Sequence, residues 1–266
     1  MNNPSVSFII IEYFSIEKAM ECVESLLSQL SGEAYEIIIS SNSCYDEKTR
    51  ENLLLNFSAV RWIFNEKNGG FAYGMNQGLK QAKGKFLVIS NPDVVVIDGL
   101  MSMISFMEAN SGIGAIGPMF IDFEGNIQDS CRRYPSLQRL LARLFRRFVK
   151  NKEIVYEKNL DYSKIQTVDW LAGAFIMVSR PAYEKTGGFD ERYFLYAEDV
   201  DWCTRIRMKG FEIVYYPKAR VLFKGSRNAR KNIKYALIFI KSHIRYWLKF
   251  GFFGGYPSRK KFIFNG

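Results

Sequence analysis

Histidine and cysteine, which supply many catalytic and metal-binding groups, are scarce in this chain of 266 residues. The single histidine, His243, which we interpret as structural, offers no basis for a serine–histidine triad or for a zinc site with several histidines. The four cysteines occur at none of the spacings typical of metal sites or redox motifs. We therefore expect any chemistry to depend mainly on carboxylates, and the cysteines to be reduced.

Long apolar runs are also missing. The longest ones are interrupted well before the ~18 residues that a membrane-spanning helix needs. The N-terminal residues lack the basic region and apolar stretch of a signal peptide. We therefore expect a cytoplasmic protein that meets a membrane, if at all, peripherally at the inner face of the cell membrane.

The composition is that of a globular protein with a basic surface. Hydrophobic residues make up 48% of the chain and aromatic residues 15%, enough for the core of one large α/β domain or two small ones. The formal charge of +10 favours anionic partners such as nucleotides, phospholipid head groups or nucleic acid, and does not choose among them. No RNA-binding motif or zinc-ligand pattern is present, so we expect no nucleic-acid partner.

Strands and helices are predicted to alternate in the first half of the chain. Apolar runs indicate strands at 6–11, 35–39, 60–64 and 85–90, and helical periodicity indicates helices at 19–30 and 72–82, with a further helical stretch between the second and third strands. This alternation predicts a parallel sheet, in which ligands bind beyond the carboxyl ends of the strands. Polar residues stand at those ends: Glu12-Tyr13, Ser41-Asn42, Asn65 and Asn91-Pro92-Asp93.

The second half has a different pattern. Residues 168–179 predict a strand pair or a bent strand, residues 198–209 predict a helix closed by Gly210, and two short strands are expected after it. We see no repeat, low-complexity tract or clear linker. We therefore expect one domain followed by a C-terminal extension.

Two groups of carboxylates are candidates for chemistry. Asn91-Pro92-Asp93 is a good turn sequence, yet a carboxylate at the end of a central strand could hold a divalent cation that bridges the phosphates of a nucleotide. Glu198, Asp199 and Asp201 begin a predicted helix, where acids offset the helix dipole, and this is our interpretation of Asp201. The preceding "GGFDERYFLYA" suggests a pocket wall, in which Glu198 or Asp199 could act as a general base.

Two further segments have open alternatives. Asn68-Gly69-Gly70 is either a simple helix entry or a place where backbone approaches a ligand, and the absence of GxGxxG after the first strand argues against a NAD enzyme. Residues 136–149, "SLQRLLARLFRRFV", predict a basic amphipathic helix that either packs on the core or docks on a membrane surface. Residues 234–250 mix aromatic and cationic residues less regularly.

Two long segments together resemble the family-2 glycosyltransferases, in particular their bacterial rhamnosyltransferase-like branch. They are "NGGFAYGMNQGLKQAKGKFLVISNPDVVV" and "WLAGAFIMVSRPAYEKTGGFDERYFLYAEDVDWCTRIRMKGFEIVYYPKARV", and the resemblance covers roughly residues 5–250. It implies the GT-A fold, an α/β nucleotide-binding fold with a mostly parallel central sheet flanked by helices. The implied division is a catalytic domain at 1–228, with a donor half at 1–97 and an acceptor half at 98–228, and a basic, aromatic helical extension at 229–266.

The resemblance also implies roles for individual residues. Asp93 would contact a divalent cation, Mn²⁺ or Mg²⁺, that bridges the donor diphosphate, and Asp199 would deprotonate the acceptor hydroxyl. Glu198, Trp170 and Gly173 would lie on the acceptor side. The implied donor-binding set is Tyr13, Ser41, Asn42, Gly70, Asn76, Asn91, Asp93, Lys224 and Arg227.

Three positions depart from the family pattern. Ser41-Asn42-Ser43-Cys44 stands where relatives usually have Asp-Asn-Ala-Ser, whose aspartate reads the nucleobase. Phe223 stands where a histidine is common, so Lys224 or Arg227 would have to neutralise diphosphate instead. Glu12 stands where an asparagine is common.

The resemblance therefore implies an inverting glycosyltransferase that moves a sugar from a nucleotide-diphospho-sugar to a growing, lipid-linked surface polysaccharide. The first candidate donor is deoxythymidine-diphosphate rhamnose, and galactofuranose, glucose or another hexose would need no large change in the motifs. The alternative is a protein that kept the fold for binding nucleotide sugars or glycans and lost activity through the Ser41 and Phe223 departures.

Overall fold

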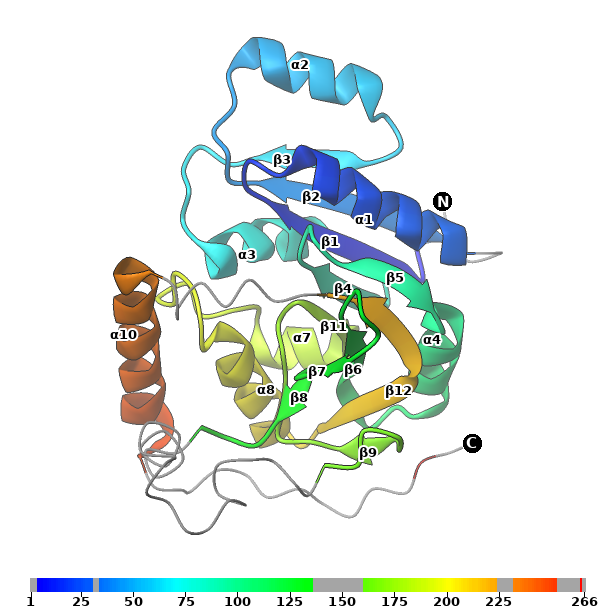
Figure 1. Ribbon diagram of the computed structural model, residues 1–266, viewed down its shortest axis with the longest axis vertical. Helices are drawn as coiled ribbons and strands as arrows, with labels where there is room; N and C mark the ends of the chain where they lie inside the picture. The colour runs from blue at the N-terminus through cyan, green and yellow to red at the C-terminus, as the bar shows by residue number, and fades with distance from the viewer. Residues whose placement is uncertain (1–3, 31–33, 136–159, 224–231, 253–263, 265–266) are drawn as a thin grey trace.

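A large mixed sheet with helices on both faces forms the body of the protein (Figure 1). The computed structural model describes residues 4–30, 34–135, 160–223, 232–252 and 264. The main path of the sheet has the order β3-β2-β1-β4-β11-β6-β12-β5, and β7 and β9 pair with β6 and β12 beside it. The α/β architecture predicted from the sequence is confirmed.

The strands of the first half pair with one another in parallel. Its strands are β1 (Val6–Glu12), β2 (Tyr35–Ser41), β3 (Arg61–Phe64) and β4 (Phe86–Ser90), and its helices are α1 (Ile16–Gln29), α2 (Glu47–Asn56) and α3 (Phe71–Gln81). β1 pairs in parallel with both β2 and β4. The predicted βα alternation is thus confirmed, with bounds shifted by a few residues.

The side chains of β1 explain why both faces of the sheet are covered. Val6, Phe8 and Ile10 point into one core with α1 and with α4 (Leu100–Ala109), whereas Ile9 and Ile11 point into a second core with α3. Residues of a strand alternate between faces, so an unbroken apolar run is what a strand buried on both faces requires.

The second half adds both parallel and antiparallel pairings to the same sheet. Its strands there include β5 (Val95–Asp98), β6 (Ile113–Ile121), β7 (Ile127–Gln128), β9 (Gln166–Thr167), β11 (Phe175–Ser179) and β12 (Glu212–Leu222), while β8 (Cys131–Arg132) and β10 (Trp170–Leu171) form a separate small pair. β12 pairs in parallel with β6, while β11 and β5 are antiparallel to their neighbours. The antiparallel partner of β4 is β11, which brings the second half against the central strand of the first. The helices here are α7 (Arg180–Thr186) and α8 (Glu198–Met208), which pack on the second core.

One prediction for this region was wrong. After α8 the chain forms a single strand, β12, rather than two short ones. Its register with β6 shifts between Tyr216 and Arg220, around Pro217, which has no N–H to donate to a neighbouring strand. The proline interrupts the pairing without ending the strand.

The helix expected in the C-terminal extension is α10 (Ile233–Phe250), which stands at the left of Figure 1 beside α8. Within the described part of the chain, no helix is both long enough and apolar enough to cross a bilayer. The predicted basic helix at 136–149 lies outside the described residues.

Candidate active site

The Asn91-Pro92-Asp93 turn directly follows the central strand β4. The Asn91 N–H donates to the carbonyl of Ala174 at 2.8 Å, which attaches the turn to the segment that leads into β11. Asp93 is half-buried at the carboxyl end of the parallel strands. Burial raises the pKa of its carboxyl, while its own backbone N–H and the charge of Lys18 lower it. This is where the sequence predicted a carboxylate for a ligand.

Asp199 is linked to the same turn through two adjacent residues. The Gly173 N–H donates to Oδ2 of Asp199 at 3.0 Å, and Gly173 immediately precedes Ala174, which binds the Asn91 N–H. A Cβ at position 173 would lie 3.1 Å from the Cβ of Asp199, so glycine permits this close approach. Gly173 and Ala174 therefore connect the carboxylate of Asp199 to the turn that carries Asp93, although the two aspartates are 106 positions apart in the sequence.

Glu198 and Asp199 form a pair of like charges at the start of α8. Burial, followed by the charge of Asp199, raises the pKa of Glu198 well above that of an ordinary glutamate. Burial also raises the pKa of Asp199, against the lowering effect of the N–H groups of Gly173 and Val200 and of the Arg132 charge. Among the described residues, Oε2 of Glu198 has no hydrogen-bond partner. A carboxyl with a raised pKa is a stronger base once deprotonated.

The backbone before α8 is strained. Tyr196 and Ala197 both have positive φ, 69° and 66°, although neither is glycine. Such conformations cost about 1–3 kcal/mol each and persist where the surroundings enforce them. Their effect here is to place Glu198 and Asp199 directly on the first turn of the helix.

Arg132 is a site residue that the sequence interpretation missed. It lies on β8 opposite Trp170 of β10, and its guanidinium is 5.4 Å from the centre of the indole ring. Its charge acts on Asp199, and its Nε is buried with no hydrogen-bond partner among the described residues. Trp170, predicted on the acceptor side, donates its Nε1–H to the carbonyl of Arg133 at 2.8 Å. Only the pairing of two very short strands brings this cation to the carboxylates.

The glycine turn before α3 packs against the loop that precedes α8. Gly70 has a φ of 89°, and a Cβ there would lie 2.2 Å from the carbonyl oxygen of Phe194. The same carbonyl accepts the Phe71 N–H at 2.8 Å, and the Gly70 carbonyl accepts from the Asn42 side chain at 3.0 Å. The backbone of this turn lies close to Phe194, and the predicted contact of Gly70 with the donor stays a prediction.

Comparisons with known proteins agree with this geometry. The model of the family described as Glycosyl transferase family 2 matches residues 7–187. This chain belongs to that family. It is 30% identical over 213 residues to an N-acetylglucosaminyl-diphospho-decaprenol L-rhamnosyltransferase of Mycobacterium tuberculosis, covering 74% of this chain and 68% of the relative. It is 24% identical over 259 residues to the rhamnosyltransferase WbbL of Escherichia coli, covering 91% of this chain and 90% of the relative.

Solved structures support the fold of this family-2 glycosyltransferase. A crystal structure of GalNAc-T7 with UDP, GalNAc and Mn²⁺ has a TM-score of 0.63 at 17% identity, covering 85% of this chain and 45% of that one. The mannosyltransferase PcManGT of Pyrobaculum calidifontis, in complex with GDP-Man and Mn²⁺, has a TM-score of 0.60 at 17% identity, covering 94% of this chain and 65% of that one. The predicted GT-A fold and the predicted glycosyltransferase activity are confirmed.

Asn76, predicted to bind the donor, clamps α3 of the glycosyltransferase to the loop before α8. Its Nδ2 donates to the Phe189 carbonyl at 2.8 Å and to Glu191 at 2.9 Å, and its Oδ1 accepts the Phe189 N–H at 2.8 Å. Gly188 leaves room for this contact, since a Cβ there would lie 2.2 Å from Oδ1. Both amide hydrogens of Asn76 therefore have protein partners, and its contact with the donor stays a prediction.

Glu12, one of the departures from the family pattern, is a buried hub at the end of β1. It is 0% exposed. Its Oε2 accepts from the hydroxyls of Ser41 at 2.5 Å and Ser43 at 2.9 Å, and its Oε1 accepts from the Ser15 N–H at 2.7 Å and the Tyr45 hydroxyl at 3.1 Å. The departure at Glu12 is thus physically coupled to the departure at Ser41, because the two side chains bind each other.

The same hub supports an exposed aromatic surface beside the strand ends. The Phe14 N–H donates to the Ser43 hydroxyl at 2.7 Å, and Phe14 has a positive φ of 47°. Tyr13 and Phe14 are 52% and 66% exposed, with ring centres 4.8 Å apart. Tyr13 is therefore accessible to a ligand, whereas Ser41 and Asn42 are buried and bind protein groups.

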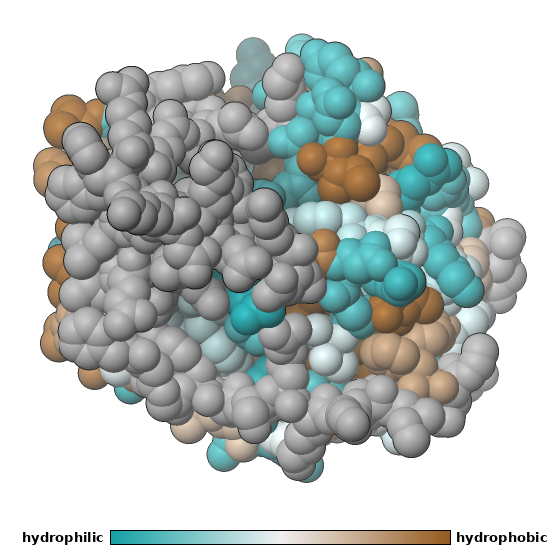
Figure 2. Space-filling view, turned by 60° about the horizontal axis from the view of Figure 1, so that its bottom comes forward, coloured by the Kyte–Doolittle hydropathy of each residue, from teal (hydrophilic) through white to brown (hydrophobic). Residues whose placement is uncertain are grey.

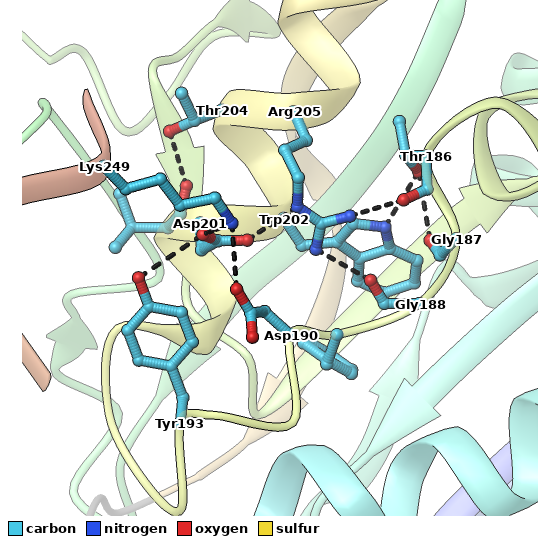
Figure 3. Close-up of polar contacts among 12 residues, drawn as sticks. Thr186, Gly187, Gly188, Asp190, Tyr193, Asp201, Trp202, Thr204, Arg205 and Lys249 are labelled. Atoms are coloured by element: carbon cyan, nitrogen blue, oxygen red, sulfur yellow. Dashed lines mark hydrogen bonds and ion pairs between the residues drawn. The ribbon is translucent and has the colours of Figure 1, made fainter. Parts of the chain in front are cut away.

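Asp201 has a different role from the one expected. It is fully buried and pairs with Arg205 at 2.6 Å and with Lys249 of α10 at 2.5 Å (Figure 3). Lys249 also pairs with Asp190 at 3.0 Å, in the loop before α8. The interpretation of Asp201 as an acid that only offsets the helix dipole was therefore incomplete. Its partner Lys249 lies 48 residues further along the chain, so local sequence does not reveal this ion pair.

The remaining predicted residues lie at or beyond the end of β12. The Phe223 N–H donates to the Ile121 carbonyl at 2.8 Å, and its ring packs on Phe120 at 5.4 Å between centres. An aromatic hydrocarbon ring cannot ligate a metal. Lys224 and Arg227 lie outside the described residues.

Asp93 is the candidate ligand for a divalent cation. No group of three histidine, cysteine, aspartate or glutamate residues in the described part of the chain could hold a metal ion by itself. Mg²⁺ and similar ions are often bound through one or two carboxylates together with substrate phosphates and water. Asp93, half-buried at the strand end, fits that kind of site.

Proposed function

We propose that this glycosyltransferase moves rhamnose from deoxythymidine-diphosphate rhamnose to a hydroxyl of a lipid-linked glycan at the inner face of the cell membrane, with inversion at the anomeric carbon. The activities for which the relatives are named support the sugar and the lipid-linked acceptor, and a dTDP-rhamnosyl transferase RfbF of Shigella flexneri is 20% identical over 224 residues. The observation that carries the proposal is the connection of the Asp93 turn to Asp199 through Gly173 and Ala174. We also propose residues 1–228 as the catalytic domain.

Asp199 is the proposed general base. Its Oδ2 is oriented by the Gly173 N–H and its Oδ1 by the Val200 N–H at 2.8 Å, so the carboxylate has a defined direction. As the acceptor oxygen attacks the anomeric carbon, its proton passes to Asp199. Direct attack from the side opposite the leaving diphosphate inverts that carbon, and no covalent glycosyl-enzyme forms. Glu198, whose buried Oε2 has no hydrogen-bond partner among the described residues, is proposed to orient the acceptor by accepting or donating a hydrogen bond.

Asp93 is the proposed ligand of a divalent cation, Mn²⁺ or Mg²⁺. When bound, such an ion neutralises charge on the diphosphate. The two structural neighbours are complexes with Mn²⁺, which supports the proposal. Arg132 is a second cation on the acceptor side, with its guanidinium 5.4 Å from the centre of the Trp170 ring, and we propose that it keeps Asp199 ionised until the acceptor arrives.

The test begins with calorimetric titration of nucleotide sugars, with and without Mn²⁺ or Mg²⁺, into the wild type, Asp93→Asn and the exposed control Asp161→Asn. We expect metal-dependent binding of one donor that only Asp93→Asn abolishes. Transfer is then measured with that donor and a lipid-linked acceptor, where Asp199→Asn should lose transfer while it keeps donor binding.

Two results would contradict parts of the proposal. If a donor other than deoxythymidine-diphosphate rhamnose binds, the assignment of the sugar is wrong and the assignment of the protein as a glycosyltransferase is unaffected. If a donor binds and no acceptor is glycosylated by the wild type, the alternative of a binding protein without activity is favoured.

A further inference from the structure

The outer face of α10 carries an apolar stripe that no other described residue of the protein covers. Its members are spaced three or four residues apart and are between 43% and 78% exposed: Ile233, Leu237, Ile240, Ile244 and Leu248. At 100° per residue they lie within about 80° of the helix circumference, and at 1.5 Å per residue they extend over about 22 Å. Figure 2 shows hydrophobic side chains along the left edge of the molecule, the side on which α10 lies in Figure 1.

Cations border this stripe. Lys234 and Lys241 are exposed and lie next to the stripe on the helical projection, on the side away from the protein body. The sequence of α10 contains no aspartate or glutamate. The exposed surface of the helix therefore combines apolar side chains with positive charge only.

The opposite face of α10 is firmly attached to the catalytic part. The Tyr246 hydroxyl lies 2.9 Å from that of Thr204 on α8, and the Ser242 hydroxyl donates to the Leu195 carbonyl at 2.8 Å. Lys249 binds Asp190 and Asp201, as Figure 3 shows. Because these bonds fix the rotation of the helix, the stripe has a defined orientation relative to Glu198 and Asp199 at the start of α8.

We propose that the stripe of α10 docks the enzyme on an anionic lipid surface, with the helix lying in the plane of the interface. A narrow apolar face with a cationic border matches acyl chains below and anionic head groups beside it. A second copy of this chain is a poorer occupant, because pairing the two stripes in antiparallel fashion brings Lys241 of one copy beside Lys241 of the other. The proposal rests on the proposed function, since it would present the acceptor site to a lipid-linked glycan.

Vesicle binding tests this surface directly. Wild type, the double variant Leu237→Gln/Ile244→Gln and the control Leu54→Gln/Leu55→Gln are sedimented with vesicles of phosphatidylcholine alone or with phosphatidylglycerol. Leu54 and Leu55 lie on α2 and are 51% and 81% exposed, so they match the substituted residues in chemistry and exposure. We expect binding of the wild type to the anionic vesicles, a decrease of at least about tenfold in the α10 variant, and no change in the control.

Charge is tested separately with Lys234→Glu/Lys241→Glu. This variant should lose most binding to anionic vesicles and bind phosphatidylcholine no more weakly than the wild type does. Raising the salt concentration should weaken binding of the wild type to anionic vesicles.

Three outcomes would overturn the proposal: no binding of the wild type to anionic vesicles, binding that the α10 variant retains in full, or a wild-type dimer in light scattering that the α10 variant converts to a monomer. Donor titration of every variant separates this failure from a failure of the proposed function. A wild type that binds donor normally and does not bind anionic vesicles overturns the docking proposal and leaves the donor site intact, whereas a wild type that binds vesicles and no donor does the reverse.

Discussion

Glu12 is predicted to be a major determinant of stability, because it is the common acceptor for four donors inside the protein. Replacement by alanine leaves three hydroxyls and the Ser15 N–H without that acceptor in a region where Glu12 itself is 0% exposed. A hydrogen bond to a charged group contributes about 1.5–3 kcal/mol, and such values do not add fully when hydroxyls can rotate to each other or to entering water. We therefore expect Glu12→Ala to lower the free energy of unfolding by about 4 kcal/mol.

Glu12→Gln is the informative companion variant. It keeps the volume and one carbonyl oxygen, and the neighbouring hydroxyls can turn to accept from the new NH₂ group. The expected loss is about 1–2 kcal/mol. Urea unfolding followed by circular dichroism measures both values, with the exposed Glu24→Ala as a control that should stay within about 0.5 kcal/mol of the wild type.

The hub also holds the loop that carries Tyr13 and Phe14, so its loss should affect the donor more than the chemical step. For Glu12→Gln, which is expected to remain folded, we predict a raised KM for the donor with kcat within about threefold of the wild type. The reasoning is refuted if Glu12→Ala is as stable as the wild type, or if glutamine proves as damaging as alanine.

Three further predictions concern the base, the glycine turn and the C-terminal helix. Burial raises the pKa of Asp199, and only its deprotonated form accepts a proton. As the pH is lowered, kcat should therefore begin to fall at a pH above the one at which an ordinary aspartate becomes protonated. A kcat that stays constant down to the pH of an ordinary aspartate would argue against Asp199 as the base. Gly70→Ala meets both a positive φ and the Phe194 carbonyl, so thermal or urea unfolding should show a loss of at least about 2 kcal/mol, and an unchanged midpoint would contradict the described turn. Lys249→Met removes one of the two cations that bind the buried Asp201, for a loss of about 1–3 kcal/mol; a Lys249→Arg variant should recover part of it.

The sequence alone was enough for the order of elements in the first half and for the location of Asp93. Both depend on local information: apolar runs with the period of a buried strand, glycines where the chain turns, and a carboxylate placed where a strand must end. The same information indicated that α8 begins at Glu198, as the structure has it. The family resemblance then supplied the fold and the class of reaction.

Only the tertiary structure decided which distant residues meet. The pairing of two-residue strands places the charge of Arg132 near Asp199. Glu12 accepts hydrogen bonds from hydroxyls 29 to 33 residues away, and Asp201 pairs with Lys249 across 48 residues. The spacing of apolar residues in the sequence does not predict such contacts, because they depend on how strands and helices pack after they form. The stripe on α10 is a similar case, since the pattern predicts an apolar face and only packing shows that this face is left exposed.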